Sequence, residues 1–412
     1  MQEKISPSLS QAEQSEVCAL VAAGLPLPDG YRERLFQTGD SRPLPPIPRL
    51  RLRERLCAEA APWINTLIQG DNRDILLAAL NGPLAEAIRA AGGVRLIYLD
   101  PPFATGARLP IFLDIGGERS ALAAIAYSDV WKGGVRTFLS MLFTRLALMR
   151  DLLAEDGSIY VHCDHRSAAF IRLFLDHLFG ADRFLGEIIW HYTGGGRARR
   201  YFSRKHDTLL HYAKSSRWIF RPDEIRVPYA PGSGYARGGI VSASGKRYAP
   251  NPLGTPVDDV WSLPIVNPLS RERLAYPTQK PERLLERIIR ASSHPGDLVA
   301  DFFCGSGTTL AVAEGLGRKW LGADAGAFAI QTSRKRLLLL RRNLENPPPF
   351  AILDCAPEAP RPGQPCTVRL RGGEFSYAPP KIRAGLRPAG AGFYVELRAF
   401  LVQDGPQEGE LT

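Results

Sequence analysis

The pattern of apolar and polar positions along the 412 residues predicts buried strands that alternate with amphipathic helices. Short apolar runs at residues 96–99, 158–164 and 298–301 are typical of strands that a parallel sheet buries on both faces. Apolar residues from Leu142 to Leu153 instead recur every three or four positions, which is the period of one helix face. We therefore expect an α/β fold.

The first of these strands ends in an unusual turn. Residues 96–99 are followed by Asp100, Pro101, Pro102 and Phe103. Because proline cannot continue a strand ladder and fixes the backbone, a carboxylate, a carbonyl and an aromatic ring are presented together at the carboxyl end of the strand. Ligands bind at that edge of open α/β sheets. On residue types alone, the run is also explained as a strand with a Pro–Pro stop.

A glycine turn follows a second strand, which ends at Asp301. Gly305 and Gly307 allow the backbone to turn tightly and approach a ligand, and Thr308 or Thr309 is a candidate cap of the next helix. A lone Gly-x-Gly pair is weak evidence, but a strand ending in an acid before it and a helix after it are the context that such a turn needs. The turn consists of Phe302, Phe303, Cys304, Gly305, Ser306, Gly307, Thr308 and Thr309.

Together the two motifs resemble those of the amino-directed DNA methyltransferases, in which an Asp-Pro-Pro-Tyr/Phe turn works with a Phe-x-Gly-x-Gly loop that binds S-adenosylmethionine. The Asp-Pro-Pro-Phe turn comes first here, an order similar to that of the permuted (β) group. This group includes many adenine-N6 enzymes and the modification (Mod) subunits of type III restriction systems. The resemblance covers roughly residues 66 to 340. It implies a Rossmann-like methyltransferase fold, with a mostly parallel sheet and helices on both faces.

The resemblance also implies which residues bind S-adenosylmethionine. The run from Tyr276 to Pro281 is similar to the family segment around the methionine end of the cofactor, and an acid after the next strand, Asp324, is placed to bond ribose hydroxyls. Asp71 is either a contact near the adenine ring or the N-cap of a helix. The candidate cofactor residues are Asp71, Asp100, Thr278, Gln279, Lys280, Asp301, Phe303, Cys304, Gly305, Ser306, Gly307, Thr308, Thr309 and Asp324.

By the same resemblance, the catalytic residues are Asp100, Pro101, Pro102 and Phe103. The Asp100 carboxylate and the Pro101 carbonyl would each accept one N–H of a flipped-out base, whose ring would stack on Phe103. Cytosine-N4 enzymes more often carry serine at position 100, so the aspartate favours adenine-N6. Phe103 in place of the commoner tyrosine and Phe302 in place of a usual proline are departures that leave the site intact.

Bulk composition is that of an ordinary globular protein, with 45% hydrophobic and 23% charged residues. No apolar run approaches the roughly 20 residues of a membrane span, and the polar amino terminus does not resemble a signal peptide. The six cysteines include no C-x-x-C pair, which argues against a zinc site and a disulfide framework. We expect no metal, no membrane contact and a cytoplasmic location.

Positive charge is concentrated in one segment of a chain whose formal net charge is +10. Between His191 and Pro250, 12 basic residues face 3 acidic ones, and aromatic residues lie among them. Such a run is also typical of a solvated face, but in the resembled family the target-recognition region is inserted here, which implies double-stranded DNA as the partner. The candidate DNA-binding residues are Arg197, Arg199, Arg200, Arg204 and Lys205.

The expected domain organisation follows from these motifs. We expect the long segment 104–128 to be a mobile loop over the target base and Arg49–Leu56 to be a basic helix. The domains are an N-terminal helical and loop extension (1–64), a catalytic domain (65–190 and 265–346), a basic target-recognition insertion (191–264) and a small β appendage of unknown role (350–412).

Several alternatives stay open at this point. An N4-cytosine DNA methyltransferase is one alternative. A methyltransferase that acts on RNA or on a protein amide is another, because Asn/Asp-Pro-Pro turns serve those enzymes too. A DNA-binding subunit that retains the fold without catalysis is a non-enzymatic alternative, and the intact Asp100 and glycine turn argue against it. The sequence shows neither a nuclease motif nor an ATP loop, so any restriction subunit would be a separate chain. It does not decide whether the chain forms a homodimer.

Overall fold

The computed structural model describes most of the chain between residues 48 and 377. The described residues are 48, 50–56, 61–114, 121–131, 134–193, 197–342, 344, 346–355, 366–370 and 373–377. The expected N-terminal extension lies outside them up to residue 47, as does the end of the expected appendage from residue 378. Within the described residues, no helix has both the length and the apolar character that crossing a membrane requires.

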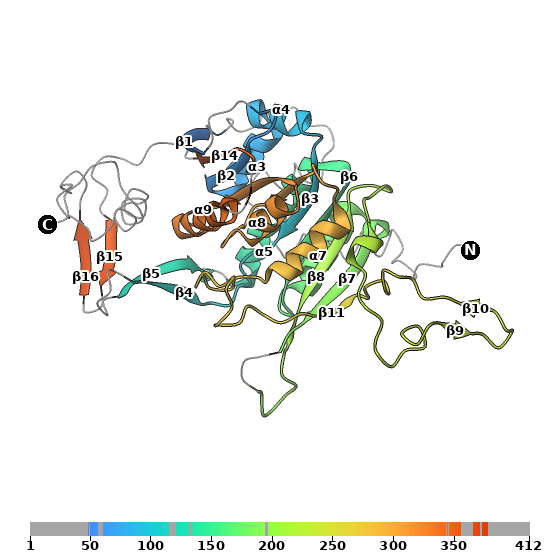
Figure 1. Ribbon diagram of the computed structural model, residues 1–412. Helices are drawn as coiled ribbons and strands as arrows, with labels where there is room; N and C mark the ends of the chain where they lie inside the picture. The colour runs from blue at the N-terminus through green and yellow to red at the C-terminus, as the bar shows by residue number, and fades with distance from the viewer. Residues whose placement is uncertain are drawn as a thin grey trace.

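A ten-stranded sheet forms the centre of the molecule (Figure 1). Its strands lie in the order β1, β14, β2, β13, β12, β3, β6, β8, β7, β11. Their bounds are β1 Leu50–Leu56, β14 Phe350–Cys355, β2 Asn65–Gly70, β13 Lys319–Asp324, β12 Leu298–Asp301, β3 Val94–Leu99, β6 Leu153–Cys163, β8 His206–Ala213, β7 Phe184–His191 and β11 Val260–Ser262.

Most neighbouring strands of this sheet are parallel. From β14 to β6 every pair is parallel, β8 runs antiparallel between β6 and β7, and β11 is parallel to β7. The carboxyl ends of β2, β13, β12, β3, β6 and β7 therefore meet at one edge. The prediction of a mostly parallel sheet is confirmed.

Helices cover both faces of the sheet, as predicted (Figure 1). Because successive side chains of a strand point to opposite faces, Ile97 packs with one helix layer and its neighbour Leu96 with the other. The first layer comprises α3 (Asn72–Leu80), α4 (Gly82–Ala90), α5 (Val135–Leu152) and α6 (Ala168–Phe179). The second comprises α7 (Glu282–Ser292), α8 (Thr308–Gly315) and α9 (Ala327–Arg341).

The expected basic helix at residues 49–56 is wrong, because Leu50–Leu56 is the edge strand β1. Leucine and arginine alternate along it, and this period of two suits a strand with one apolar face. β1 pairs antiparallel with β14, and the Arg53 guanidinium forms an ion pair with Asp354 across the two strands. Residues 350–355, assigned from sequence to the appendage, therefore belong to the central sheet as β14.

The expectation of a mobile loop at residues 104–128 is also wrong. Most of this segment forms an antiparallel hairpin of β4 (Arg108–Asp114) and β5 (Ala121–Ser128). Two strands of the predicted appendage, β15 (Cys366–Leu370) and β16 (Gly373–Tyr377), continue the hairpin as a four-stranded sheet (Figure 1). Elsewhere, β9 (Ile240–Val241) and β10 (Arg247–Tyr248) form a short hairpin within the basic segment.

Glu314 is a buried polar centre between the sheet and the second helix layer. Its carboxylate, with no exposed surface, accepts hydrogen bonds from Trp320 Nε1 at 2.8 Å, Arg341 Nε at 2.8 Å and Asn65 Nδ2 at 3.3 Å. These contacts tie α8 to β13, α9 and β2. A buried carboxylate stabilises the fold only while its cationic partner compensates for lost hydration.

Replacing Arg341 with methionine is expected to lower the free energy of unfolding by about 3 kcal/mol, because the Glu314 charge then stays buried without a cationic partner. Urea denaturation measures the change. The control is Arg342→Met at the neighbouring exposed position, where the change should stay within about 0.5 kcal/mol. Equal effects of the two substitutions would contradict this role of the ion pair.

Candidate active site

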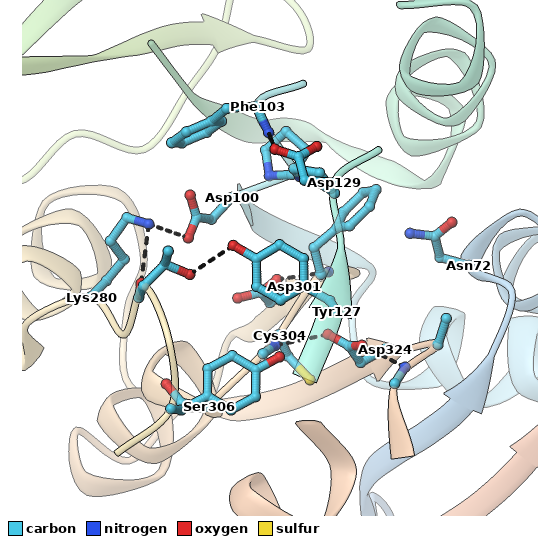
Figure 2. Close-up of a pocket in the computed structure, with 18 of the residues that line it drawn as sticks. Asn72, Asp100, Phe103, Tyr127, Asp129, Lys280, Asp301, Cys304, Ser306 and Asp324 are labelled. Atoms are coloured by element: carbon cyan, nitrogen blue, oxygen red, sulfur yellow. Dashed lines mark hydrogen bonds and ion pairs between the residues drawn. The ribbon is translucent and has the colours of Figure 1, made fainter. Parts of the chain in front are cut away.

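A cavity of about 690 Å³ opens at the carboxyl edge of the parallel strands (Figure 2). Asp100 follows β3, and Asp301 and Asp324 are the last residues of β12 and β13. The segment from Tyr276 to Lys280 closes one side. Every predicted catalytic and cofactor residue except Gly307 lines this cavity. The fold thus brings together two motifs that lie far apart in the sequence.

Asp129 fixes the backbone of the Asp-Pro-Pro-Phe turn. Its carboxylate is 2% exposed and accepts hydrogen bonds from the backbone N–H groups of Phe103 at 3.2 Å, Ala104 at 2.9 Å and Thr105 at 2.8 Å. These bonds hold Ala104 at a positive φ of 54°, which a non-glycine residue rarely adopts. Sequence reasoning missed this role. The indole of Trp131, two residues further along the chain, also donates to Asp129 at 3.0 Å.

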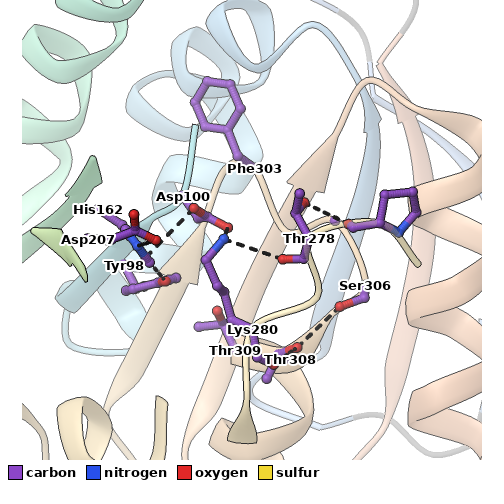
Figure 3. Close-up of polar contacts among 12 residues, drawn as sticks. Tyr98, Asp100, His162, Asp207, Thr278, Lys280, Phe303, Ser306, Thr308 and Thr309 are labelled. Carbon is purple, nitrogen blue, oxygen red and sulfur yellow. Dashed lines mark hydrogen bonds and ion pairs between the residues drawn. The ribbon is translucent and has the colours of Figure 1, made fainter. Parts of the chain in front are cut away.

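The two oxygens of Asp100 have different surroundings (Figure 3). Oδ2 accepts a hydrogen bond from Lys280 Nζ at 2.5 Å, so the turn and the Tyr276–Lys280 segment meet in an ion pair. Oδ1 is buried and has no hydrogen-bond partner in the structure. A buried acceptor without a donor is costly, and at a cavity wall it suits a ligand that carries N–H groups.

The glycine turn is shaped so that its backbone faces the cavity. Gly305 and Gly307 have positive φ angles of 49° and 71°. A Cβ at Gly307 would lie 2.6 Å from Ser333 Oγ, and one at Gly305 would lie 3.3 Å from Tyr276 Cε1. The loop therefore requires glycine at both positions, at Gly307 for packing against α9 and at Gly305 for the approach of Tyr276.

The predicted threonine cap of the helix after this turn is wrong, because the N-cap of α8 is Gly307 and no side chain caps the helix. The two threonines have other partners. Thr309 Oγ1 donates to Asp301 at 2.5 Å, and Thr308 Oγ1 donates to the Lys280 carbonyl at 3.2 Å. They join the glycine turn to β12 and to the Tyr276–Lys280 segment.

Burial changes the acidity of the two strand-end aspartates. Burial raises the pKa of Asp301 to about 7, even though Thr309 and the Phe303 N–H hydrogen-bond its carboxylate. Burial likewise raises the pKa of Asp324 to about 6, and the N–H groups of Gly326 and Gly305 offset part of this effect at 2.8 and 2.9 Å. At neutral pH Asp324 is therefore mostly ionised and accepts hydrogen bonds, whereas Asp301 is partly protonated.

The remaining cofactor candidates also line the cavity, although their side chains are already engaged. Asp71 caps α3 by accepting from the Arg73 N–H at 2.8 Å, which confirms the cap interpretation, and its carboxylate also pairs with Arg145 at 2.7 Å. Gln279 bonds the Glu272 carbonyl and so closes its own loop. Thr278 has a φ of 61° and lies 3.1 Å from the Tyr127 hydroxyl.

The predicted DNA-binding residues lie in the connection between β7 and β8, at the same sheet edge as the cavity. Arg197, Arg199, Arg200 and Arg204 are exposed, and Lys205 is half-buried. A hydrogen bond from the Tyr192 N–H to the Lys205 carbonyl, 2.9 Å long, closes the base of this loop. Two aromatic side chains accompany the charges, Tyr201 at 64% and Phe202 at 99% exposure.

Comparison with known proteins gives a consistent result. A family model described as DNA methylase, of the N6/N4 methyltransferases, matches residues 94–335. The type II methyltransferase M.EcaI of Enterobacter cloacae is 30% identical over 336 residues, covering 67% of this chain and 70% of that protein. The DNA adenine methyltransferase YhdJ of Escherichia coli is 32% identical over 276 residues, covering 66% and 82%.

Solved structures with a related arrangement were also found. The M1.HpyAVI–SAM complex covers 68% of this chain and 99% of its own, at 20% identity and a TM-score of 0.41. The cytosine-N4-specific PvuII DNA methyltransferase covers 68% and 87%, at 16% identity and a TM-score of 0.44.

The chain belongs to the DNA methylase family that comprises the N6-adenine and N4-cytosine enzymes. Its sheet and helix layers are those of the Rossmann-like methyltransferase fold. The family is dependent on S-adenosylmethionine, which is therefore the cofactor of this protein.

The cavity fits S-adenosylmethionine. Its volume of about 690 Å³ falls within the ~300–1,000 Å³ typical of small-molecule sites. The glycine turn presents backbone instead of side chains at Gly305, and Asp324 ends the adjacent strand β13. An acid at this place is the usual acceptor for ribose hydroxyls. Among the described residues, no group of three or more side chains could hold a metal ion.

Replacing Asp324 with asparagine is expected to change how stability depends on pH. The folded state raises the pKa of this carboxyl from its ordinary 3.8 to about 6, so between these values the folded protein holds a proton that the unfolded chain has released. The stability of the unmodified protein relative to the variant should therefore fall as pH rises from about 4 to about 6.

Urea denaturation across that pH range measures the difference. Calorimetry at neutral pH should also show weaker binding of S-adenosylmethionine to Asp324→Asn, whereas Asp151→Asn, with 59% side-chain exposure, should match the unmodified protein. A pH-independent stability difference would contradict the raised pKa.

Proposed function

We propose that the protein methylates the exocyclic N6 amino group of adenine in double-stranded DNA at specific sites. The observation that carries this proposal is the shared cavity, into which both the Asp100–Phe103 turn and the glycine turn open. A methyl donor held by one turn and an amino group held by the other would meet there. Positioning of this kind supplies a large part of the rate in group transfer.

The chemistry requires the nitrogen lone pair to be turned out of the aromatic ring. Asp100 accepts one N–H of the amino group and the Pro101 carbonyl accepts the other, so the nitrogen moves toward tetrahedral geometry. Pro102 fixes the backbone that carries this carbonyl. When bound, the cofactor supplies an electrophilic methyl group on a sulfonium, whose leaving group is neutral.

The target base must leave the duplex to reach this turn, because the amino group lies inside the base stack. Phe103 is half-buried at the cavity wall, its ring 5.7 Å from that of His162, and it offers a face for the flipped base. Lys280 Nζ lies 5.5 Å from the Phe103 ring. The base would thus be held by a ring on one side and by the Asp100 and Pro101 acceptors at its edge.

The cofactor residues have distinct tasks in this proposal. Asp324 accepts the ribose hydroxyls, Asp71 lies near the adenine ring, and the Thr278–Lys280 segment surrounds the methionine end. The glycine turn supplies close backbone contact. The residues of that turn and its strand are Asp301, Phe303, Cys304, Gly305, Ser306, Gly307, Thr308 and Thr309.

Adenine is favoured over cytosine by the aspartate at position 100. A carboxylate is a stronger acceptor for an amino N–H than the serine hydroxyl that is more frequent in cytosine-N4 enzymes. The DNA adenine methyltransferase YhdJ is among the relatives that match this chain. The basic residues of segment 191–264 then contact the DNA and supply target recognition.

Asp100→Ala is expected to reduce methyl transfer at least about 1,000-fold while leaving the affinity for S-adenosylmethionine within a few-fold, because the carboxylate acts on the amino group. Nucleoside mass spectrometry of plasmid incubated with protein and cofactor measures the product, and calorimetry measures cofactor binding. The unmodified protein should yield N6-methyladenine. N4-methylcytosine would correct the base, and full activity of Asp100→Ala would overturn the catalytic assignment.

Alanine at Arg199 and Arg200 is expected to weaken DNA binding similarly for all sequences and to lower the slope of log affinity against log salt by up to about 2. Arg89→Ala is the control, since this exposed arginine lies on α4, away from the β7–β8 loop (Figure 1). Fluorescence anisotropy from 50 to 200 mM salt gives both quantities. An unchanged salt slope would show that the loop makes no phosphate contact.

A further inference from the structure

His162 lies directly behind Asp100 and is fully buried (Figure 3). The β6 strand places its imidazole between two carboxylates. Nδ1 is 3.7 Å from Asp100 Oδ1, and Nε2 is 3.3 Å from Asp207 Oδ2 on β8. Carboxylates on both sides of an imidazole can stabilise the positive charge that it gains when it accepts a proton.

The hydrogen bonds define the resting state of this histidine. Since Asp207 is an acceptor, Nε2 carries the proton and donates it to that carboxylate. Nδ1 then accepts the bond from the Tyr98 hydroxyl, 2.8 Å away. Nδ1 then has no hydrogen to donate to Asp100 Oδ1, 3.7 Å away, which accounts for the missing donor at that oxygen. With these hydrogen bonds, Nδ1 is the nitrogen of His162 that can accept a proton once the Tyr98 hydroxyl turns its hydrogen away.

The other titratable groups around His162 do not compete for this role. Burial raises the pKa of Tyr98 well above its ordinary value, with a further contribution from Asp100, so its hydroxyl stays protonated. Burial and Asp207 raise the pKa of Tyr192 to about 12, and its hydroxyl lies 3.3 Å from Asp207. Although burial opposes ionisation of Asp207, the hydrogen bonds from His162 and Tyr192 and the charge of Lys280 lower its pKa overall.

The remaining surroundings of His162 are aromatic or already paired. Trp190 on β7 and Phe103 pack against the imidazole with ring centroids 5.6 and 5.7 Å away. The nearby cation Lys280 binds Asp100 through Oδ2, the oxygen that does not face His162. The imidazole is thus shielded from water, and its two polar neighbours that line the cavity are Asp100 and Tyr98.

Methyl transfer creates a need for a proton acceptor at this place. The amino nitrogen gains a methyl group and a positive charge while it keeps both hydrogens, so one N–H bond must break to restore its lone pair. We propose that His162, oriented by Asp207, receives this proton through Asp100. The proposal rests on the methyl transfer proposed above.

The step is balanced in protons and electrons. The amino N–H bond breaks, its electron pair returns to nitrogen, and an oxygen of Asp100 takes the proton. Rotation of the carboxyl group about its Cβ–Cγ bond turns that oxygen toward His162. The Tyr98 hydroxyl turns its hydrogen away from Nδ1, and the proton moves to Nδ1. The products are the neutral methylated amine, the Asp100 carboxylate and an imidazolium between Asp100 and Asp207. His162 acts through Asp100 and is a positioning residue, not a group that touches the substrate.

Single-turnover methyl transfer at saturating cofactor and DNA, measured from pH 5 to 9, tests this role. The unmodified protein should lose rate toward acid, because a protonated His162 accepts no further proton. His162→Gln keeps a donor toward Asp207 but has no titratable group. It should slow transfer at neutral pH at least about tenfold and abolish the acidic limb, with cofactor affinity unchanged. His165→Gln, three residues along the chain and exposed, should behave as the unmodified protein.

Asp207→Asn provides a second measurement that does not depend on the folding of the histidine variant. It retains a hydrogen-bonding side chain but removes the charge that stabilises the imidazolium, so the acidic limb should move to lower pH. A His162→Gln variant with the unmodified rate and acidic limb, or an unmoved limb in Asp207→Asn, would overturn the relay alone. Absence of any methylated base with the unmodified protein would instead overturn the proposed function and the relay with it.

Discussion

The site depends on one constraint, which is that parallel strands bring their carboxyl ends to the same edge. β3, β12 and β13 are adjacent, and each is ended or followed by an aspartate: Asp100, Asp301 and Asp324. Three carboxylates so close together repel one another unless donors or cations compensate. The chain supplies Lys280 for the first, Thr309 for the second and two backbone N–H groups for the third. The strand arrangement that brings these three carboxylates to the cavity therefore also makes them repel one another.

Strained backbone conformations also occur beside the cavity at this sheet edge. The positive φ angles of Ala104 and Thr278 lie in the two segments that bracket the cavity, and each is held by surrounding contacts. The Asp129 carboxylate, with three backbone N–H groups bound, fixes the first. Backbone conformations of this kind persist only where the surrounding contacts hold them in place. Their presence here indicates a site whose geometry is set before a ligand binds. Glu314 and its hydrogen-bond partners lie away from this edge, between the sheet and the second helix layer.

The motifs were predictable because their information is local. An apolar run, an acid and a proline or glycine turn lie within a dozen residues, so the sheet edge and most cavity residues follow from them. Asp129 and His162 act through partners distant in sequence, which no local pattern reveals. Leu50–Leu56 forms a strand instead of the expected helix. Its period of two suits a sheet edge, and the strand that it pairs with, β14, comes from a distant part of the chain.

The order of strands also sets the distance between the Asp100–Phe103 turn and the β7–β8 loop, which carries the candidate DNA-binding arginines. Between β3 and β7 stand β6 and β8, so three strand spacings of about 4.8 Å separate the ends of β3 and β7 by about 14 Å. A DNA strand advances about 3.4 Å per nucleotide along the duplex axis, and this separation therefore corresponds to about four nucleotides. With the target base in the cavity, the arginines of the β7–β8 loop would meet phosphates only a few steps away. In the proposed function, the order of strands would thus couple the placement of the flipped base to the backbone contacts beside it.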